Sequence, residues 1–276
     1  MNKVINESFL LLKEKEITNP ELDLRILLKH ASYNKKDIIL SNLNIENIDI
    51  NYFKLLISKR LKYEPVSKII NSKFFWKHEF FVNHDVLDPR PESELIIEET
   101  LFNVRNKNKK LKILDIGTGS GCLAISLAKE FKNSLITAID ISDKALKVAN
   151  KNIIQHKCEN QIKLKLTKLD NINDKFDIIV SNPPYVEEKE YKNLQKEIQN
   201  FEPKIALIGG KSGLKFYKLF ARKIEKFMKR KSLFICEIGQ NQENEVKAIF
   251  NKTNLILKKI TKDVQNIDRT LTFFKI

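Results

Sequence analysis

The feature that most constrains the fold is an alternation of apolar, strand-like runs with helix-like segments, which begins near residue 110. Such an alternation is typical of α/β domains in which helices cover a mostly parallel sheet. Strands are expected at residues 112–116, 135–139, 162–166, 176–180, 233–238, 255–260 and 270–274. Helices are expected at residues 123–131, 143–155, 214–229 and 243–251. Because residues 263–268 form only a short connection, we expect the last two strands to be antiparallel.

The residues before this alternation have a different pattern. Helical spacing of apolar residues, together with the helix-start signal Asn19-Pro20-Glu21, predicts a small helical domain. The triplets Phe74-Phe75-Trp76 and Phe80-Phe81-Val82 then predict a β-hairpin. We therefore expect three parts: a helical docking domain at residues 1–68, a β-hairpin linker at residues 69–88, and an α/β domain at residues 89–276.

Composition limits the classes of function. The chain has 276 residues, is 42% hydrophobic and carries a formal net charge of +15. Most of this charge comes from lysine, whereas interfaces that read bases favour arginine, so we expect no dedicated nucleic-acid binding. No apolar run is long enough to span a membrane, and the N-terminus lacks the features of a secretory signal. The scattered Cys122, Cys158 and Cys236 indicate reduced thiols in the cytoplasm, and no metal site is predicted.

Asn182-Pro183-Pro184-Tyr185 directly follows a run, residues 176–181, that is predicted to be a buried strand. Two prolines end a strand and fix the backbone. The Asn182 side chain and the Asn182 and Pro183 carbonyls would then lie at the carboxyl edge of the sheet, where α/β proteins bind ligands. Oxygen atoms held rigidly there can accept hydrogen bonds from a planar NH2 group. An ordinary turn is the alternative interpretation of an Asn-Pro pair.

A second motif is a strand that ends at Asp115 and Ile116, followed by Gly117-Thr118-Gly119-Ser120-Gly121. Such a turn lets a ligand approach the backbone, and the helix behind it offers free N–H groups. The spacing is GxGxG instead of the dinucleotide pattern GxGxxG, and Asp115 would repel a pyrophosphate and attract a cation. Asp140 ends the next strand, where an acid can bind ribose hydroxyls. Its alternative role is a helix N-cap, for which Ser142 competes.

Together these features point to S-adenosylmethionine, which combines a ribose, an adenine, an amino-acid group and a cationic sulfonium. The residues expected to bind it are Asp115, Gly117, Thr118, Gly119, Gly121, Asp140 and Asn182. An NAD-dependent oxidoreductase is disfavoured by the glycine spacing and by Asp115. A cofactor-binding module without catalysis is a further alternative.

On these motifs the chain resembles the class I methyltransferases with an (Asn/Asp)-Pro-Pro-(Tyr/Phe) motif, and more narrowly the HemK-type peptide chain release factor glutamine methyltransferases. The narrower resemblance covers essentially the whole chain. It rests on Asp88–Glu94, similar to a PRPxTE segment, on Phe201–Leu207 with Gly209-Gly210 and Ser212-Gly213-Leu214, on Glu237-Ile238-Gly239 with Gln242, and on Asp268-Arg269.

The resemblance implies a Rossmann-like sheet of seven strands, the last antiparallel, behind a helical domain and a hairpin. It implies methyl transfer from S-adenosylmethionine to the glutamine amide in the Gly-Gly-Gln loop of class-1 peptide chain release factors. An adenine-N6 or other nucleic-acid amino methyltransferase is the alternative, because an exocyclic NH2 group is also planar. We expect a monomer.

The expected roles in the site are as follows. Asn182, Pro183 and Tyr185 are predicted to be catalytic, and Asn182, Pro183, Pro184, Tyr185, Arg90 and Glu94 to bind the substrate. Arg90 and Glu94 have an alternative role as an ion pair that joins domains. Residues 186–200 are expected to form either a flap over the acceptor or a surface helix. Lys168 stands where the family has Asp or Asn beside the adenine, so either Asp170 replaces that contact or the contact is weaker.

Overall fold

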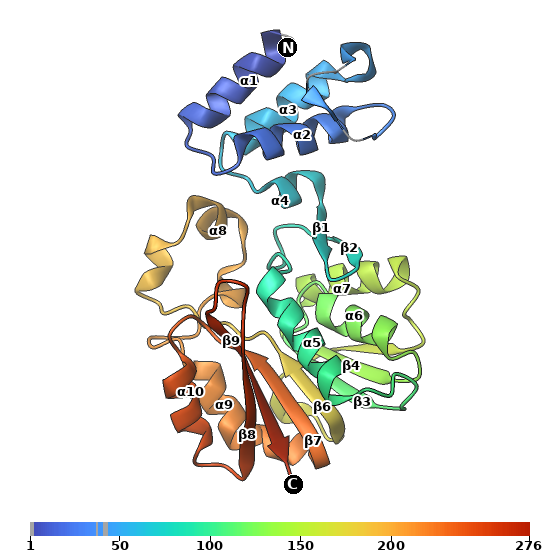
Figure 1. The fold of residues 1–276 in the computed structure, drawn as a ribbon, viewed down its shortest axis with the longest axis vertical. Coiled ribbons are helices and arrows are strands. Elements are labelled where there is room, and N and C mark those ends of the chain that lie inside the picture. Colours follow the sequence, from blue (N-terminus) through green and yellow to red (C-terminus); the bar gives the residue numbers. More distant parts are fainter. Residues whose placement is uncertain (1–2, 37, 41–43) are drawn as a thin grey trace. The chain divides into compact units, whose positions relative to one another are not determined.

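The computed structural model describes residues 3–36, 38–40 and 44–276, and the chain divides into two compact units (Figure 1). Unit 1 comprises Met1–Ser72 and Gln195–Phe201. Unit 2 comprises Lys73–Leu194 and Glu202–Ile276. No described helix has the length and apolar character that crossing a membrane requires.

Unit 1 is helical. Its α-helices are α1 (Lys3–Glu14), α2 (Pro20–Ala31), α3 (Ile50–Arg60), α4 (Val66–Ile70) and α8 (Lys196–Phe201). Pro20 begins α2 as the sequence predicts, but the Asn19 side chain makes no capping hydrogen bond. Asp49 does cap α3, because its carboxylate accepts a hydrogen bond of 2.9 Å from the backbone N–H of Tyr52. The apolar faces of α1, α2 and α3 meet in one core that includes Leu12, Leu24 and Phe53.

One arginine connects α8 to the rest of unit 1. Arg60 is only 4% exposed. Its Nε donates to Asp23 Oδ2 at 2.6 Å, and its Nη2 donates to Glu197 Oε1 at 2.6 Å. A buried guanidinium needs such carboxylate partners, because an unpaired charge is costly away from water. Residues 186–200, predicted as a flap or a surface helix, contain a short 3-10 helix (Glu190–Asn193) and most of α8.

Unit 2 contains a hairpin and a seven-stranded sheet. The hairpin pairs β1 (Ser72–Phe75) with β2 (His78–Phe81). The sheet strands are β3 (Lys112–Ile116), β4 (Leu135–Asp140), β5 (Ile162–Leu166), β6 (Phe176–Ser181), β7 (Met228–Glu237), β8 (Leu255–Lys262) and β9 (Asp268–Lys275). Their order is β5-β4-β3-β6-β7-β9-β8, and β9 runs antiparallel to both of its neighbours. The predicted Rossmann-like sheet with an antiparallel last strand is therefore confirmed.

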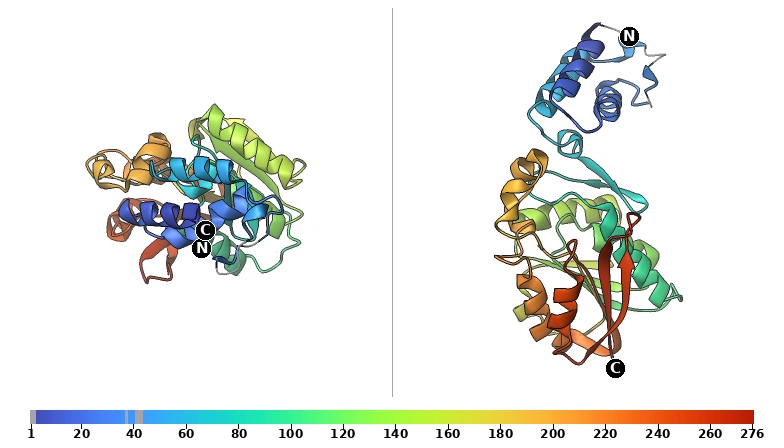
Figure 2. Two further views of the ribbon diagram at one scale, coloured as in Figure 1. Left: turned by 90° about the horizontal axis from the view of Figure 1, so that it is seen from above. Right: turned by 60° about the vertical axis from the view of Figure 1, so that its left-hand side comes forward.

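Helices cover both faces of this sheet (Figures 1 and 2). They are α5 (Glu94–Asn103), α6 (Cys122–Glu130), α7 (Asp143–Gln155), α9 (Lys215–Lys223) and α10 (Glu243–Phe250). Because successive side chains of a strand point to opposite faces, Ile113 packs with the cluster under α5 and α6, and Leu114 packs with the cluster under α9 and α10. The alternating apolar residues of β3 thus contribute to both cores, one between the sheet and the helices on each of its faces.

One helix prediction differs from the structure, and one helix was not predicted. The helix expected at residues 214–229 ends earlier, at Lys223, and a 3-10 helix (Ile224–Phe227) leads into β7. The physical reason is strand pairing, since Met228 already pairs with Phe176 of β6. Helix α5 was not expected, because its apolar residues are not concentrated in one stripe. Both Ile96 and Ile97 are fully buried in the structure.

The strand order places a topological switch point at β3. The chain passes from β3 to β4 on one side and returns to β6 on the other side of β3. Ligands of open α/β sheets bind at the carboxyl ends of strands where this reversal occurs. The glycine-rich turn follows β3 and the proline-rich motif follows β6, so the sheet brings the two motifs to the same crevice.

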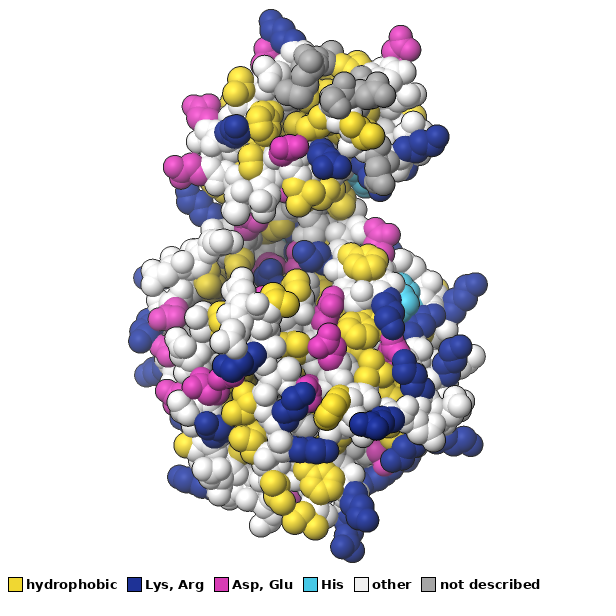
Figure 3. All heavy atoms as spheres, viewed as in Figure 1, with side chains coloured by type: hydrophobic (Ala, Val, Ile, Leu, Met, Phe, Trp, Pro, Cys, Tyr) yellow, Lys and Arg dark blue, Asp and Glu magenta, His cyan; other side chains and the backbone are white. Residues whose placement is uncertain are grey.

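Lys and Arg side chains do not form a single basic patch on the face shown in Figure 3. In Figure 3, Lys and Arg side chains are dispersed over unit 2 and interspersed with Asp and Glu. Several lysines pair with acids, among them Lys147 with Asp143 and Lys229 with Asp177.

Candidate functional site

The glycine-rich turn leaves space above its backbone. Gly117 and Gly119 have φ values of +74° and +55°, and a Cβ atom at either position would meet nothing within 4 Å. Glycine is favoured because L side chains rarely adopt positive φ, and the open space suits a ligand that approaches the main chain. Gly121 is the N-cap of α6, and because glycine has no side chain, no side-chain group caps this end of the helix. The turn therefore offers the conformation expected of a cofactor loop.

Asp115 supports this turn from beneath. It is fully buried, and the Thr118 hydroxyl donates a hydrogen bond of 2.6 Å to its Oδ2. Its Oδ1 has no hydrogen-bond partner within the described part of the chain. Burial raises the pKa of Asp115 to about 7. The side chain does not line the neighbouring cavity, so its place in the structure favours a role in holding the loop over direct contact with a ligand.

Asp140 lies at the end of β4, as predicted. Its Oδ2 accepts a hydrogen bond of 3.0 Å from the Gly119 N–H, and its Oδ1 accepts one of 2.9 Å from the Ser142 N–H. The N-cap of α7 is Ser142, whose hydroxyl accepts from the Ala145 N–H at 3.2 Å. Asp140 is therefore not the N-cap of α7. Its carboxylate instead accepts a hydrogen bond from the glycine-rich turn.

One cavity of about 350 Å³ brings the two motifs together. Of the residues predicted to form the site, Gly117, Gly119, Asp140, Asn182 and Pro184 line it. Its apolar walls include Ile141, Leu169, Phe216 and Phe220. A carboxylate for a ribose next to apolar walls for an adenine fits S-adenosylmethionine. In this arrangement Asp140 would bind the ribose, and the glycine turn would hold the amino-acid end.

Both residues whose roles the sequence left open line this cavity. Lys168 and Asp170 each line the cavity, next to Leu169. Asp170 forms an ion pair with Lys223. Of these two side chains, only the Asp170 carboxylate can accept a hydrogen bond from an adenine amino group.

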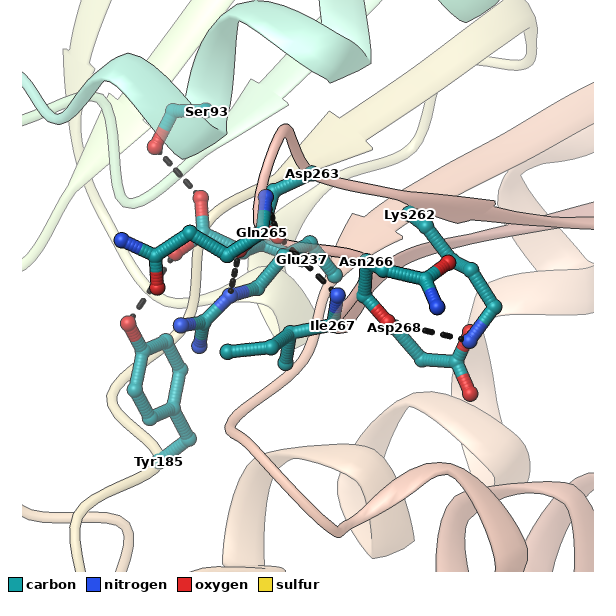
Figure 4. A network of polar contacts seen from close by, with 10 residues as sticks. Ser93, Tyr185, Glu237, Lys262, Asp263, Gln265, Asn266, Ile267 and Asp268 are labelled. Atoms are coloured by element: carbon teal, nitrogen blue, oxygen red, sulfur yellow. Dashed lines mark hydrogen bonds and ion pairs between the residues drawn. The ribbon is translucent and has the colours of Figure 1, made fainter.

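The amide of Asn182 has a defined partner. Its Nδ2 donates a hydrogen bond of 2.7 Å to Ser93 Oγ. The Ser93 hydroxyl in turn donates to Glu237 Oε2, and the Tyr185 hydroxyl donates to Glu237 Oε1 at 3.1 Å. Figure 4 shows Ser93 and Tyr185 on opposite sides of the Glu237 side chain. Four polar side chains thus form one connected network at the proline-rich motif.

Glu237 is the centre of this network and is only 1% exposed. Burial raises its pKa to about 7, although the hydrogen bonds from Ser93 and Tyr185 lower it in part. The charge of Glu237, followed by burial, raises the pKa of Tyr185 far above its usual value. Tyr185 therefore stays neutral near pH 7 and serves as a hydrogen-bond donor.

The backbone that follows the prolines is also fixed. Gln242 Nε2 donates to the Tyr185 carbonyl at 3.0 Å, and Gln242 Oε1 accepts from the Gly239 N–H at 3.0 Å. A Cβ atom on Gly213 would lie 2.4 Å from the Tyr185 carbonyl oxygen, so only glycine fits there. Pro183 is buried, and none of the described residues donates a backbone hydrogen bond to its carbonyl.

Arg90 and Glu94 have separate partners. Arg90 Nη2 pairs with Glu202 Oε2 at 2.6 Å, and Glu94 Oε1 accepts a hydrogen bond of 2.6 Å from the Trp76 N–H. Neither side chain lines the cavity, and the two do not pair with each other. Contact of Arg90 and Glu94 with a substrate therefore stays a prediction.

The sequence reasoning missed the role of Glu237 as a partner of the site. The signal was present, because Glu237 ends β7 and Asn182 follows β6, the strand beside it. Polar residues at the ends of adjacent parallel strands meet at one edge of the sheet. The contribution of Ser93 could not be found this way, since it lies in a 3-10 helix (Pro91–Ser93) outside the sheet.

Comparisons with known proteins agree with this site. A family model described as "Methyltransferase small domain" matches residues 87–204, which confirms a methyltransferase domain with S-adenosylmethionine as its cofactor. The solved structure of the hMettl16 catalytic domain, in complex with an RNA hairpin, has a TM-score of 0.57 and 17% identity over 70% of this chain and 74% of that chain. At this identity it shows the fold alone.

Relatives of known name are more similar in sequence. A bifunctional methyltransferase of Rickettsia bellii is 35% identical over 98% of this chain and 54% of its own length, so the chain spans about half of that relative. A release factor glutamine methyltransferase of Thermodesulfovibrio yellowstonii is 36% identical over 87% of each protein. Because this match covers most of both proteins, the chain belongs to the family of release factor glutamine methyltransferases.

Proposed function

We propose that this chain transfers a methyl group from S-adenosylmethionine to the side-chain amide nitrogen of the glutamine in the Gly-Gly-Gln loop of class-1 peptide chain release factors. The observation that carries the proposal is the orientation of Asn182. Its NH2 group donates to Ser93 and Asn182 lines the cavity, so its carbonyl oxygen could act as an acceptor there. Two oxygens are required to hold both N–H groups of an amide, and the Pro183 carbonyl is the second.

The chemistry sets a clear task for the protein. An amide nitrogen is a poor nucleophile because its lone pair is delocalised into the carbonyl group. S-adenosylmethionine supplies an electrophilic methyl carbon whose bond to sulfur breaks as the new carbon–nitrogen bond forms. Acceptors at Asn182 and Pro183 would hold the nitrogen in line with that carbon, and positioning can supply up to about 7–11 kcal/mol in favourable cases. The nitrogen then loses one proton to water.

Tyr185 would complete the acceptor pocket. Its hydroxyl is tied to Glu237 and its carbonyl to Gln242, so the position of its ring is fixed. A ring held in this way can pack against the aliphatic part of a glutamine. We further propose that the helical unit helps to dock the release factor, and that the reaction takes place in the cytoplasm.

The test is mass spectrometry of a class-1 release factor after incubation with the protein and S-adenosylmethionine. We expect one added methyl group on the loop glutamine, and none with Asn182→Ala. Asn133→Ala is the matched control, because Asn133 is exposed and its side chain donates to the Asn108 carbonyl, away from the cavity. Transfer of labelled methyl groups to RNA or DNA, with none to the release factor, would instead support the nucleic-acid alternative.

A further inference from the structure

An asparagine amide can present either of two faces to a ligand. Rotation of the terminal amide by half a turn exchanges its carbonyl oxygen, an acceptor, with its NH2 group, a donor. An acceptor nitrogen that carries two N–H groups needs the oxygen. If Asn182 presented its NH2 group instead, two donors would face each other at the cavity. Some other group must therefore select the orientation of the Asn182 amide.

The Ser93 hydroxyl makes this selection. A hydroxyl group has one hydrogen atom and two lone pairs. Ser93 gives its hydrogen to Glu237, so only its lone pairs are left to face Asn182. The group that approaches Ser93 Oγ at 2.7 Å must then be a donor, which is Nδ2. Ser93 is 2% exposed and Glu237 is 1% exposed, so water has little access to compete for these bonds.

Glu237 is itself held in place. Its Oε1 accepts from the Tyr185 hydroxyl at 3.1 Å, and its backbone carbonyl accepts from the Tyr217 hydroxyl at 3.1 Å. Its backbone pairs with Thr270 of β9. Glu92 and Arg269 act electrostatically on Glu237, and Arg269 and Arg90 act on Tyr185. Glu237 in turn raises the pKa values of Tyr217 and Cys236. The ionised carboxylate has no proton to donate, so in this form Glu237 is a fixed acceptor that determines the direction of the Ser93 hydroxyl.

We propose that Ser93 and Glu237 are positioning residues, which orient the Asn182 amide so that its oxygen faces the nitrogen that receives the methyl group. This inference rests on the proposed function only for the identity of the acceptor. Neither residue needs to touch the substrate. Tyr185 shares the same carboxylate, so the network would fix the amide and the aromatic wall of the acceptor pocket together.

The kinetic test is a double-mutant cycle between Ser93 and Asn182. We expect Ser93→Ala to lower kcat about ten- to a hundredfold, because a misplaced amide no longer aligns the acceptor. Ser93→Thr retains the hydroxyl and should restore most of the rate. In an Asn182→Ala background, Ser93→Ala should have almost no further effect. Equal losses in both backgrounds would overturn the proposal, since Ser93 would then act independently of Asn182.

A second measurement requires no acceptor substrate, so it remains informative if the release factor is not methylated. The Asn182 side-chain NH2 resonances, assigned with Asn182→Ala, should exchange slowly with water in the wild-type protein and rapidly in Ser93→Ala. Unchanged exchange would also overturn the proposal. Ser126→Ala is the control for loss of a buried hydroxyl, because Ser126 Oγ has no partner in the described structure. Calorimetry with S-adenosylhomocysteine confirms that each variant is folded and binds the cofactor product.

Discussion

Asn182 Nδ2 and Ser93 Oγ lie 2.7 Å apart, although 89 positions separate the two residues in the sequence. Ser93 belongs to a 3-10 helix before α5, and Asn182 directly follows β6. The contact connects the segment that enters the α/β unit to the corner formed by Asn-Pro-Pro-Tyr. The geometry of that corner therefore depends on residues outside the Asn-Pro-Pro-Tyr motif.

Asn182→Ala should separate catalysis from cofactor binding. We expect turnover to fall about a hundredfold or more, because the oxygen that holds one N–H of the acceptor is lost. The affinity for S-adenosylhomocysteine should remain nearly unchanged, since Asp140, the glycine turn and the apolar walls are intact. Single-turnover kinetics and calorimetry measure the two effects. An equal loss of both would mean that Asn182 is mainly structural.

Stability should fall as the pH rises through the range in which Glu237 ionises in the folded protein. Its pKa is about 7 when folded, against a usual value of 4.5, so the folded state retains the proton over a range in which the unfolded state has lost it. Stability from this group is fully present below about pH 4.5 and is lost as the pH approaches about 7. Between about pH 5 and about pH 8, we expect a loss of about 2 to 3 kcal/mol.

The matched control for this pH effect is Glu237→Gln, which cannot ionise. Urea unfolding of both proteins across the same pH range gives the contribution of Glu237 as the difference between the two curves. Asp115, whose pKa is also raised to about 7, contributes with the same sign in both proteins and therefore cancels. Parallel curves would show that Glu237 has no raised pKa.

Asp170 should contribute more to cofactor affinity than Lys168. Both line the cavity, but only the carboxylate could accept a hydrogen bond from an adenine amino group bound there. We expect Asp170→Ala to weaken binding of S-adenosylhomocysteine about three- to tenfold, which corresponds to one hydrogen bond. Lys168→Ala should have little effect. Lys223→Ala controls for the ion pair with Asp170, and equal weakening in that variant would assign the effect to the pair.

Arg60→Ala should destabilise unit 1 and release α8. Arg60 is buried and pairs with Asp23 and Glu197, so its removal leaves two carboxylates without a cation. We expect a cost of about 2–4 kcal/mol, with faster amide hydrogen exchange in residues 195–201. Arg25→Ala is the control, because Arg25 is an exposed arginine on α2. Unchanged exchange in α8 would show that Arg60 does not hold this segment.

Sequence pattern predicted the sheet well, because apolar runs such as Phe176–Ser181 are buried and bounded by proline or glycine. The boundaries of α7 were also predicted, since Ser142 gives a clear cap and the apolar stripe is regular. Helix α5 could not be predicted in this way, because both of its faces are partly buried and its stripe is indistinct. The early end of α9 depends on pairing between Met228 and Phe176, which is distant in the sequence.

The site was predictable only where its residues directly adjoin a strand. Gly117 and Asn182 follow β3 and β6, Asp140 is the last residue of β4, and all three line one cavity. Asp115 also lies near the end of β3, but its side chain is buried and does not line the cavity. The sequence alone does not say toward which face of β3 this side chain points. The contact between Ser93 and Asn182 joins separate elements, so no local pattern indicates it.

The most direct test of the account is a crystal structure of the protein with S-adenosylhomocysteine and a glutamine peptide from a release factor loop. We predict that the glutamine amide nitrogen donates to Asn182 Oδ1 and to the Pro183 carbonyl and lies next to the sulfur atom. A structure in which Asn182 turns its oxygen toward Ser93, or in which the glutamine lies away from this corner, would contradict the account.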